Sequence, residues 1–310
     1  MLIRRIFRLF LERLTFAIPT LFVLITLAFF LMRVAPGGPF DTEKTLSPEI
    51  RQNIEAMYHL DKPLVLQYGI YLSHILKGDF GPSFQYKDYS VNQLLAAGFP
   101  ISLTIGGLSI LLAVGVGVFL GLLAAYKQNS WLDYSLMAVS MFGISIPNFV
   151  VAPLLILLFA IVFNLLPAGG WVSGSLAHLI LPVVSLAIPQ MAYVARLMRA
   201  SMIEILNSPY IKVAKAKGLK MPTILMRHAL KPALLPIVSY LGPACAGIVT
   251  GSVVIEQIYG IPGLGRFFVQ GALNRDYTLV MGVVIFYGSL IITFNFLVDV
   301  CYRLIDPRIS

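Results

Sequence analysis

The sequence predicts an all-α membrane protein in which six transmembrane helices carry a small extracytoplasmic subdomain between helices 1 and 2. Three observations favour this class. Hydrophobic residues make up 58% of the 310 residues and charged residues only 12%, and the mean hydropathy is +0.85, which is unlike a water-soluble chain. The apolar residues also gather in runs long enough to cross a hydrocarbon core of about 30 Å at about 1.5 Å per residue.

The first run predicts a retained transmembrane helix from Leu14 to Met32. Arginines precede it, as in a secretory signal, but its 19 uncharged residues exceed the apolar stretch of a signal peptide, about 7–15 residues. We therefore expect residues 1–32 to form a cytoplasmic N-terminus and the first span.

The chain turns polar after this span. Gly- and Pro-rich stretches, MRVAPGGPF and GDFGPSF, surround two predicted helices, Pro48 to His59 and Leu64 to Leu76. We expect residues 33–98 to form the extracytoplasmic subdomain, with low charge imbalance and its own short helices.

Residues 99–310 are predicted to form a five-span core. The expected spans are, in order, 100–125, 134–166, 178–194, 233–255 and 279–302. The second of these, at 33 residues, is too long for one straight helix, and Pro147 and Pro153 predict a kinked, two-part or re-entrant element there. Small residues recur every four positions around Gly117 and Gly121, a pattern typical of close helix packing.

The placement of lysine and arginine predicts the orientation. With a cytoplasmic N-terminus, the inside segments hold 15 of these residues and the outside segments 8, in agreement with the bias of positive charge toward the cytoplasm. Both termini are therefore expected in the cytoplasm of a multi-pass protein. Membrane lipid is a natural partner of this charge, whereas nucleic acid is a poor explanation for it.

The cytoplasmic loop 196–232 is a basic island between two apolar runs, with eight Lys and Arg against one acid. Ser208 at an N-cap, Pro209 at the first helical position and Gly218 as a left-handed cap predict one short helix. A second helix is predicted to begin at Pro222 and to be stopped or kinked by Pro232.

Two interpretations of this loop compete. Contact with anionic lipid explains the charge, at about 1 kcal/mol per basic residue near the surface. It does not explain a capped helix, a glycine hinge and a second helix, which favour docking to a cytoplasmic partner. On that interpretation the small residues Ala214, Ala216 and Gly218 let the helix backbone enter a cleft of the partner.

Patterns for chemistry within the chain are missing from the sequence. There is no GxxxxGK[ST] loop for ATP phosphates, no GxSxG or HExxH, and the histidines share no metal-ligand spacing. Cys245 and Cys301 lie in apolar runs and are interpreted as packed thiols. We expect no catalytic residue, metal site or cofactor in this chain.

At the basic loop the chain resembles the permease subunits of binding-protein-dependent ABC importers. Their cytoplasmic signature combines EAA, a glycine four positions later and a distal I-x-L-P. Lys212-Val213-Ala214 stands where EAA would be, Gly218 matches the glycine, and His228-Ala229-Leu230 with Pro232 lies near the distal end. Lys in place of Glu resembles the peptide and nickel branch. The motifs YHLDKP, GDFGPSFQYKDYSV and IEQIYGIPGLG extend the resemblance, which is greatest to the oligopeptide permease B-type subunit.

The resemblance implies a type I ABC importer permease fold and a division of labour in the bacterial inner membrane. A homologous second permease completes the pathway, two cytoplasmic ATPase subunits hold ATP and Mg²⁺, and an extracytoplasmic peptide-binding protein delivers the oligopeptide. The chain itself is then no enzyme. The residues expected to dock and couple to the ATPase subunits are Tyr210, Lys212, Ala214, Ala216, Gly218, Arg227 and His228.

Several alternatives stay open. Dipeptide, glutathione, microcin and nickel importers share much of this sequence skeleton. A partner-free facilitator or channel is a different class, although the chain has no intramembrane series of acids or histidines for a proton relay. A membrane scaffold without a pathway is a third.

Overall fold

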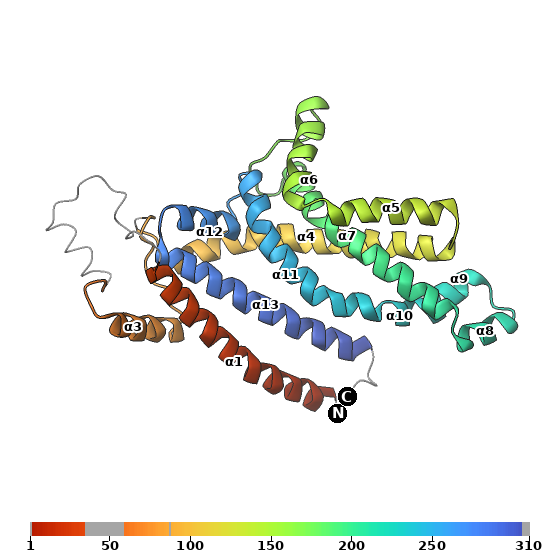
Figure 1. The fold of residues 1–310 in the computed structure, drawn as a ribbon, viewed down its shortest axis with the longest axis horizontal. Helices are drawn as coiled ribbons and strands as arrows, with labels where there is room; N and C mark the ends of the chain where they lie inside the picture. The colour runs from red at the N-terminus through yellow and green to blue at the C-terminus, as the bar shows by residue number, and fades with distance from the viewer. Residues whose placement is uncertain (1, 35–58, 87, 306–310) are drawn as a thin grey trace. The chain divides into compact units, whose positions relative to one another are not determined.

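The computed structural model describes residues 2–34, 59–86 and 88–305. Within these ranges the chain is helical apart from loops and one isolated β-bridge, between Pro82 and Ser90 (Figure 1). The predicted helix from Pro48 to His59 falls, except for its last residue, outside the described residues. The chain divides into unit 1, residues 1–10, 102–261 and 291–310, and unit 2, residues 11–101 and 262–290.

Five helices among the described residues are long and apolar enough to cross a membrane. They are α1 (Leu2–Val34), α4 (Val91–Tyr126), α7 (Leu176–Leu206), α11 (Leu235–Ile258) and α13 (Tyr277–Ile305). A sixth span is counted if a bent pair crosses as one element: α5 (Trp131–Ser145), then α6 (Asn148–Leu155) with its π-helical continuation η1 (Ile156–Val162). The predicted all-α membrane class is confirmed.

The bent pair occupies the stretch that was predicted to be over-long. Its two parts meet at 103°, and the bend lies at Ile146 and Pro147. Ile146 has extended angles, φ −90° and ψ 119°, because the ring of a following proline disfavours helical angles. Pro153 lies inside α6 and does not end it. Of the two prolines, Pro147 alone makes the break.

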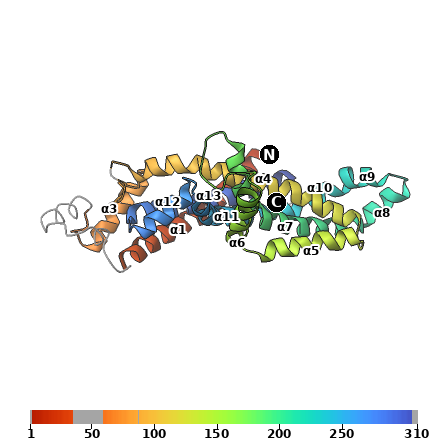
Figure 2. The ribbon, with the colours of Figure 1, turned by 90° about the horizontal axis from the view of Figure 1, so that it is seen from above.

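Helix α7 is the centre of unit 1. Helices α5, α6 and α11 pack against it, and α5 and α7 run side by side in both views (Figures 1 and 2). A Cβ on Gly117 of α4 would stand 2.8 Å from the carbonyl oxygen of Met191, and one on Gly121 would overlap the carbonyl of Ala195. The predicted small-residue seam is therefore a place where two helix backbones touch.

A partly buried ion pair also joins α5 to α7. The Arg199 guanidinium donates to both carboxylate oxygens of Asp133, from Nε at 2.6 Å and from Nη2 at 2.7 Å. The Asp133 side chain is 1% exposed and that of Arg199 26%. The backbone N–H of Asn129 donates to the same carboxylate at 3.0 Å. The pair fixes the first turn of α5 on α7.

Unit 2 gathers α3 (Leu64–Leu76), α12 (Leu264–Leu273) and the first turns of α13 with parts of α1 and α4. Buried Asp276 caps α13, because its carboxylate accepts the backbone N–H of Leu279 at 3.1 Å and that of Gln85 at 3.1 Å. Helix α3 is held on α1 by a hydrogen bond between the hydroxyls of Thr26 and Tyr68 at 2.6 Å. The hydrogen bond from Gln85 to Asp276 ties the segment after α3 to the start of α13.

Candidate functional site

The basic loop begins with a short helix, α8 (Pro209–Ala216), two residues after α7 ends. Ser208 has extended angles, φ −67° and ψ 153°, and Pro209 takes the first helical position, where no N–H partner is needed. The Ser208 hydroxyl does not cap α8 but donates to the carbonyl of Ile205 at 2.6 Å. The predicted start of the helix is confirmed, and the predicted side-chain cap is wrong because α7 uses that hydroxyl.

The end of α8 is a Schellman motif. Gly218 has φ +78°, the left-handed conformation that costs glycine nothing. Its N–H donates to the carbonyl of Lys215 at 2.9 Å, and the N–H of Leu219 donates to that of Ala214 at 3.3 Å. These two bonds define the motif. The glycine therefore works as the predicted cap, and it fixes the direction in which the chain leaves α8.

The inner face of α8 is apolar and buried. Ile211 is fully buried and Ala214 is 8% exposed, and both belong to one cluster with Met198, Met202 and Ile224. Burial of a side chain such as Ile211 contributes about 1.5–3 kcal/mol. Helix α8 is therefore a fixed part of unit 1 and not a loop suspended in solvent.

Exposed apolar side chains lie on α8, on the turn after it and on the following helical turn η2 (Ile224–Ala229), and we call them the α8 patch: Tyr210, Val213, Leu219 and Met226. Val213 is 54% exposed and Met226 63%. Exposed lysines at 212, 215 and 217 lie on the same helix and turn. An apolar patch rimmed by charge is typical of a surface that docks a protein.

A second, irregular helix follows α8. It comprises α9 (Met221–Thr223), the π-helical turn η2 (Ile224–Ala229) and α10 (Leu230–Ala233). Pro232 has no N–H to offer to the carbonyl of His228 one turn earlier, and the Tyr210 hydroxyl donates to that carbonyl at 3.4 Å. Pro232 lies inside α10, and the single residue Leu234, which keeps helical angles, separates α10 from α11, so the helix predicted to stop or kink at Pro232 is interrupted only at Leu234. Tyr210 thus connects α8 to η2.

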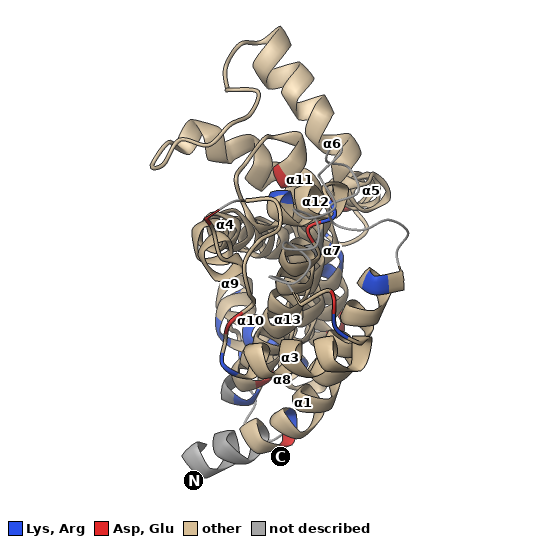
Figure 3. Ribbon diagram, turned by 90° about the vertical axis from the view of Figure 1, so that its left-hand side faces the viewer, with Lys and Arg blue, Asp and Glu red and all other residues tan. Residues whose placement is uncertain are grey.

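Most of the positive charge of the loop is available at the surface. Seven of the eight Lys and Arg between residues 196 and 231 are exposed. Figure 3 marks the Lys and Arg positions in blue along the ribbon. Arg199 differs, because its guanidinium is bound to Asp133. Its partner Asp133 lies near the start of α5, and this pair was not predicted from the sequence.

The residues predicted to dock a partner do not all face the same way. Exposed positions on α8 and η2 are held by Tyr210, Lys212, Ala216, Gly218, Arg227 and His228. Ala214 faces inward, and its small side chain lets α8 lie close to the cluster beneath. The docking role of these residues stays a prediction. For Ala214 it could act only through the seating of α8.

The sequence reasoning overlooked the α8 patch and its anchor. Ile211 and Ala214 are three residues apart, and Tyr210 and Val213 are three apart as well, so the helical period places the centres of the two pairs roughly 100° apart around α8. That signal was available in the sequence.

Groups that bind a metal do not come together in the part of the chain that the structure describes, where no three His, Cys, Asp or Glu side chains form a cluster. The geometry of α8, η2 and their surroundings offers an exposed surface and a rigid connection to α7.

A family comparison covers this region. Residues 117–310 match the model described as binding-protein-dependent transport system inner membrane component. The matched range includes α8, η2 and α11 together with the α5–α6 pair.

Several curated proteins are similar over nearly the whole chain. The oligopeptide transport system permease protein OppB of Haemophilus influenzae is 56% identical over 298 residues, 96% of this chain and 97% of that protein. OppB of Escherichia coli K12 is 56% identical over 94% of this chain and 96% of its own length. The dipeptide transport system permease protein DppB of Bacillus subtilis is 47% identical over 94% of each.

One solved structure shares the fold. It is a chain of the MetNI methionine ABC transporter, described as inward facing, with a TM-score of 0.54 and 20% sequence identity. The match covers 69% of this chain and 96% of the other. At this identity the likeness concerns the arrangement of helices.

Proposed function

The chain belongs to the family of binding-protein-dependent transport system inner membrane components, and on this premise we propose that it is the transmembrane subunit of an ATP-driven oligopeptide importer. It forms half of the pathway, and a homologous second permease forms the other half. The observation that carries the proposal is the similarity to an oligopeptide permease, 56% identity over 96% of the chain.

The proposal assigns ATP hydrolysis to other subunits. Two cytoplasmic ATPase subunits bind ATP and Mg²⁺, and an extracytoplasmic binding protein delivers the peptide. The missing phosphate-binding loop in the sequence supports this assignment, since the chain has no GxxxxGK[ST] motif. The chain is a permease in the inner membrane, with both termini and α8 on the cytoplasmic side.

Helix α8 is the part we assign to coupling. The α8 patch and the lysines on α8 form the surface that an ATPase subunit binds. Because Ile211 is buried among residues of α7 and η2, a displacement of α8 moves the ends of α7 and α11 as well. ATP-driven closure of the ATPases then alternates the access of the pathway between the two sides of the membrane.

The test uses the assembled transporter in liposomes. Val213→Glu places a charge in the α8 patch without touching the buried face, and we expect loss of ATPase co-purification and of ATP-driven uptake of a tripeptide. Gln128→Glu adds the same charge at an exposed loop position between α4 and α5 and should leave both unchanged. Normal uptake by Val213→Glu would remove the coupling role of α8.

The competing class makes a different prediction. A facilitator needs neither nucleotide nor partner, so transport by the purified chain alone in liposomes would overturn the importer proposal. Dipeptide import is the second candidate within the same class, because DppB of Bacillus subtilis is 47% identical. Competition of labelled tripeptide uptake by unlabelled dipeptides and longer peptides separates the two.

A further inference from the structure

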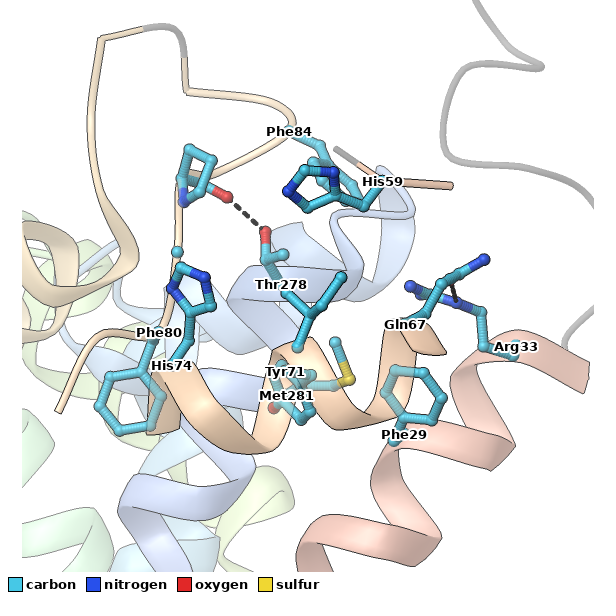
Figure 4. Close-up of a pocket in the computed structure, with 13 residues that line it drawn as sticks. Phe29, Arg33, His59, Gln67, Tyr71, His74, Phe80, Phe84, Thr278 and Met281 are labelled. Carbon is cyan, nitrogen blue, oxygen red and sulfur yellow. Dashed lines mark hydrogen bonds between the residues drawn. The ribbon is translucent and has the colours of Figure 1, made fainter. Parts of the chain in front are cut away.

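Unit 2 contains a cavity of about 180 Å³ between the end of α1, one face of α3 and the start of α13 (Figure 4). Aromatic rings, among them Phe29, Phe80 and Phe84, form much of its wall. Its polar lining comes from Arg33, Gln67, Tyr71, Thr278 and the imidazoles of His59 and His74. None of these lining groups is an acid.

The guanidinium of Arg33 is the charge at this cavity. Its Nε donates to the amide oxygen of Gln67 at 3.1 Å, and its carbon lies 4.9 Å from the centre of the Phe29 ring and 5.8 Å from that of Tyr277. Its Nη1 is buried and has no hydrogen-bond partner among the described residues. A neutral amide and two rings hold the cation in place, but they do not neutralise it.

A second polar atom at the cavity is also left without a partner. The Tyr71 hydroxyl is buried and makes no hydrogen bond with the described residues. Burial raises the pKa of Tyr71 above its ordinary value, so the hydroxyl keeps its proton and can donate. The guanidinium and the phenol are both donors, and a carboxylate is an acceptor that carries the charge the guanidinium lacks as a partner.

The size of the cavity limits what can enter. Sites for small molecules usually occupy about 300–1,000 Å³, whereas this one offers about 180 Å³, which is room for one side chain. Small aromatic-walled pockets that take a single side chain are characteristic of the anchor points of protein interfaces. Arg33 ends the first span, on the side expected to be extracytoplasmic.

From these observations we propose that the cavity is an anchor pocket for an acidic side chain of the extracytoplasmic peptide-binding protein. The carboxylate pairs with Arg33 and, after a small adjustment of the ring, accepts a hydrogen bond from Tyr71. The inference rests on the proposed function, since it requires a binding protein that docks on this chain. It adds the position and the chemistry of one contact.

The experiment measures the affinity of the assembled transporter, in nanodiscs of zwitterionic lipid, for the peptide-binding protein of the same system loaded with trialanine. Arg33→Gln removes the charge and keeps a polar side chain, and we expect the Kd to rise at least ~10-fold. Ile70→Trp fills the cavity from α3 without altering Arg33 and should weaken binding similarly. Tyr71→Phe should have a smaller effect, about threefold, because it removes one hydrogen bond.

Two controls keep the outcomes distinct. Lys77→Gln removes one exposed positive charge at the end of α3, outside the cavity, and should change the Kd by less than ~3-fold. Basal ATPase activity and subunit composition should be unchanged in every variant. A variant that fails to assemble is replaced in the comparison by the other cavity variant.

Three results would overturn the anchor pocket. The first is a wild-type Kd in both Arg33→Gln and Ile70→Trp. The second is an equal rise of the Kd in Lys77→Gln, which would mean that the positive charge of the surface attracts the binding protein without a specific pocket. The third is a normal Kd with impaired peptide uptake in the cavity variants, which would mean that the cavity contacts the transported peptide and not the binding protein. If the wild-type transporter neither binds the binding protein nor takes up peptide, the proposed function fails instead.

Discussion

The α8 region and the α1–α3 cavity use positive charge in opposite ways. On α8 the lysines lie at the surface around an apolar patch, and the helix is held by the buried side chains beneath it. At the cavity, Arg33 is partly enclosed by aromatic rings, with an amide as its hydrogen-bond partner. An exposed charged side chain can change its conformation and is screened by salt, whereas an enclosed charge requires a specific partner. The two regions should therefore respond very differently to single substitutions.

A large effect on stability is expected at the partly buried pair within unit 1. Asp133→Ala leaves the Arg199 guanidinium without its carboxylate, and we expect a loss of about 2 kcal/mol, since the partly exposed guanidinium is left uncompensated but can still be hydrated. The melting temperature of the purified transporter in detergent reports it. Asp133→Ala combined with Arg199→Met should recover most of the loss. No recovery would mean that the two residues act separately.

The next effect separates the two faces of α8. Ala214→Glu forces a charge into the buried cluster and should release α8, at a cost of at least ~2 kcal/mol. Ala216→Glu, two residues on and exposed, should leave α8 seated. Limited trypsin digestion after Lys215 and Lys217 measures the difference, and rapid cleavage is expected in Ala214→Glu alone. Equal cleavage in both variants would contradict the assigned orientation of α8.

A smaller effect is expected at the cap. Gly218→Ala keeps the space free, since nothing lies within 4 Å of a Cβ there, but φ is +78°. The left-handed conformation costs a residue with a Cβ about 1–2 kcal/mol, and the coupling of ATP hydrolysis to uptake should fall as α8 loosens. Gly107→Ala, at a helical position that is equally open, serves as the control and should have no effect.

The smallest effect is expected for a single exposed lysine. Lys212→Gln should reduce ATPase affinity by less than ~5-fold, because exposed ion pairs contribute about 0.2–1 kcal/mol. The reduction should fade as salt is raised. A loss as large as that of Val213→Glu would make charge, and not the apolar patch, the main part of the docking surface.

Local signals in the sequence were sufficient for the helices and for the ends of α8. Pro209, Gly218 and Pro147 act on the backbone of their immediate neighbours, so their effect can be read without knowing the fold. The long apolar runs predicted the spans for the same reason, although the helices extend beyond them. Helix α7, for example, continues through polar residues to Leu206.

Pairings between distant segments could not be predicted in this way. Asp133 and Arg199 are 66 positions apart, and nothing in either neighbourhood indicates the other. In the sequence, Arg33 is a charge that directly follows a predicted span. Its position beside α3 and α13 depends on the fold. Ala214 was expected to face a partner, and its burial depends on the cluster beneath α8, whose members come from distant parts of the sequence.

The central claim is that α8 docks an ATPase subunit, and photo-crosslinking from position 213 in the intact transporter tests it most directly. A photoreactive residue in place of Val213 should give an adduct with the ATPase subunit, while the same residue at Gln128 should not. Adducts with lipid alone from position 213 would contradict the account and return the basic loop to a lipid-binding role.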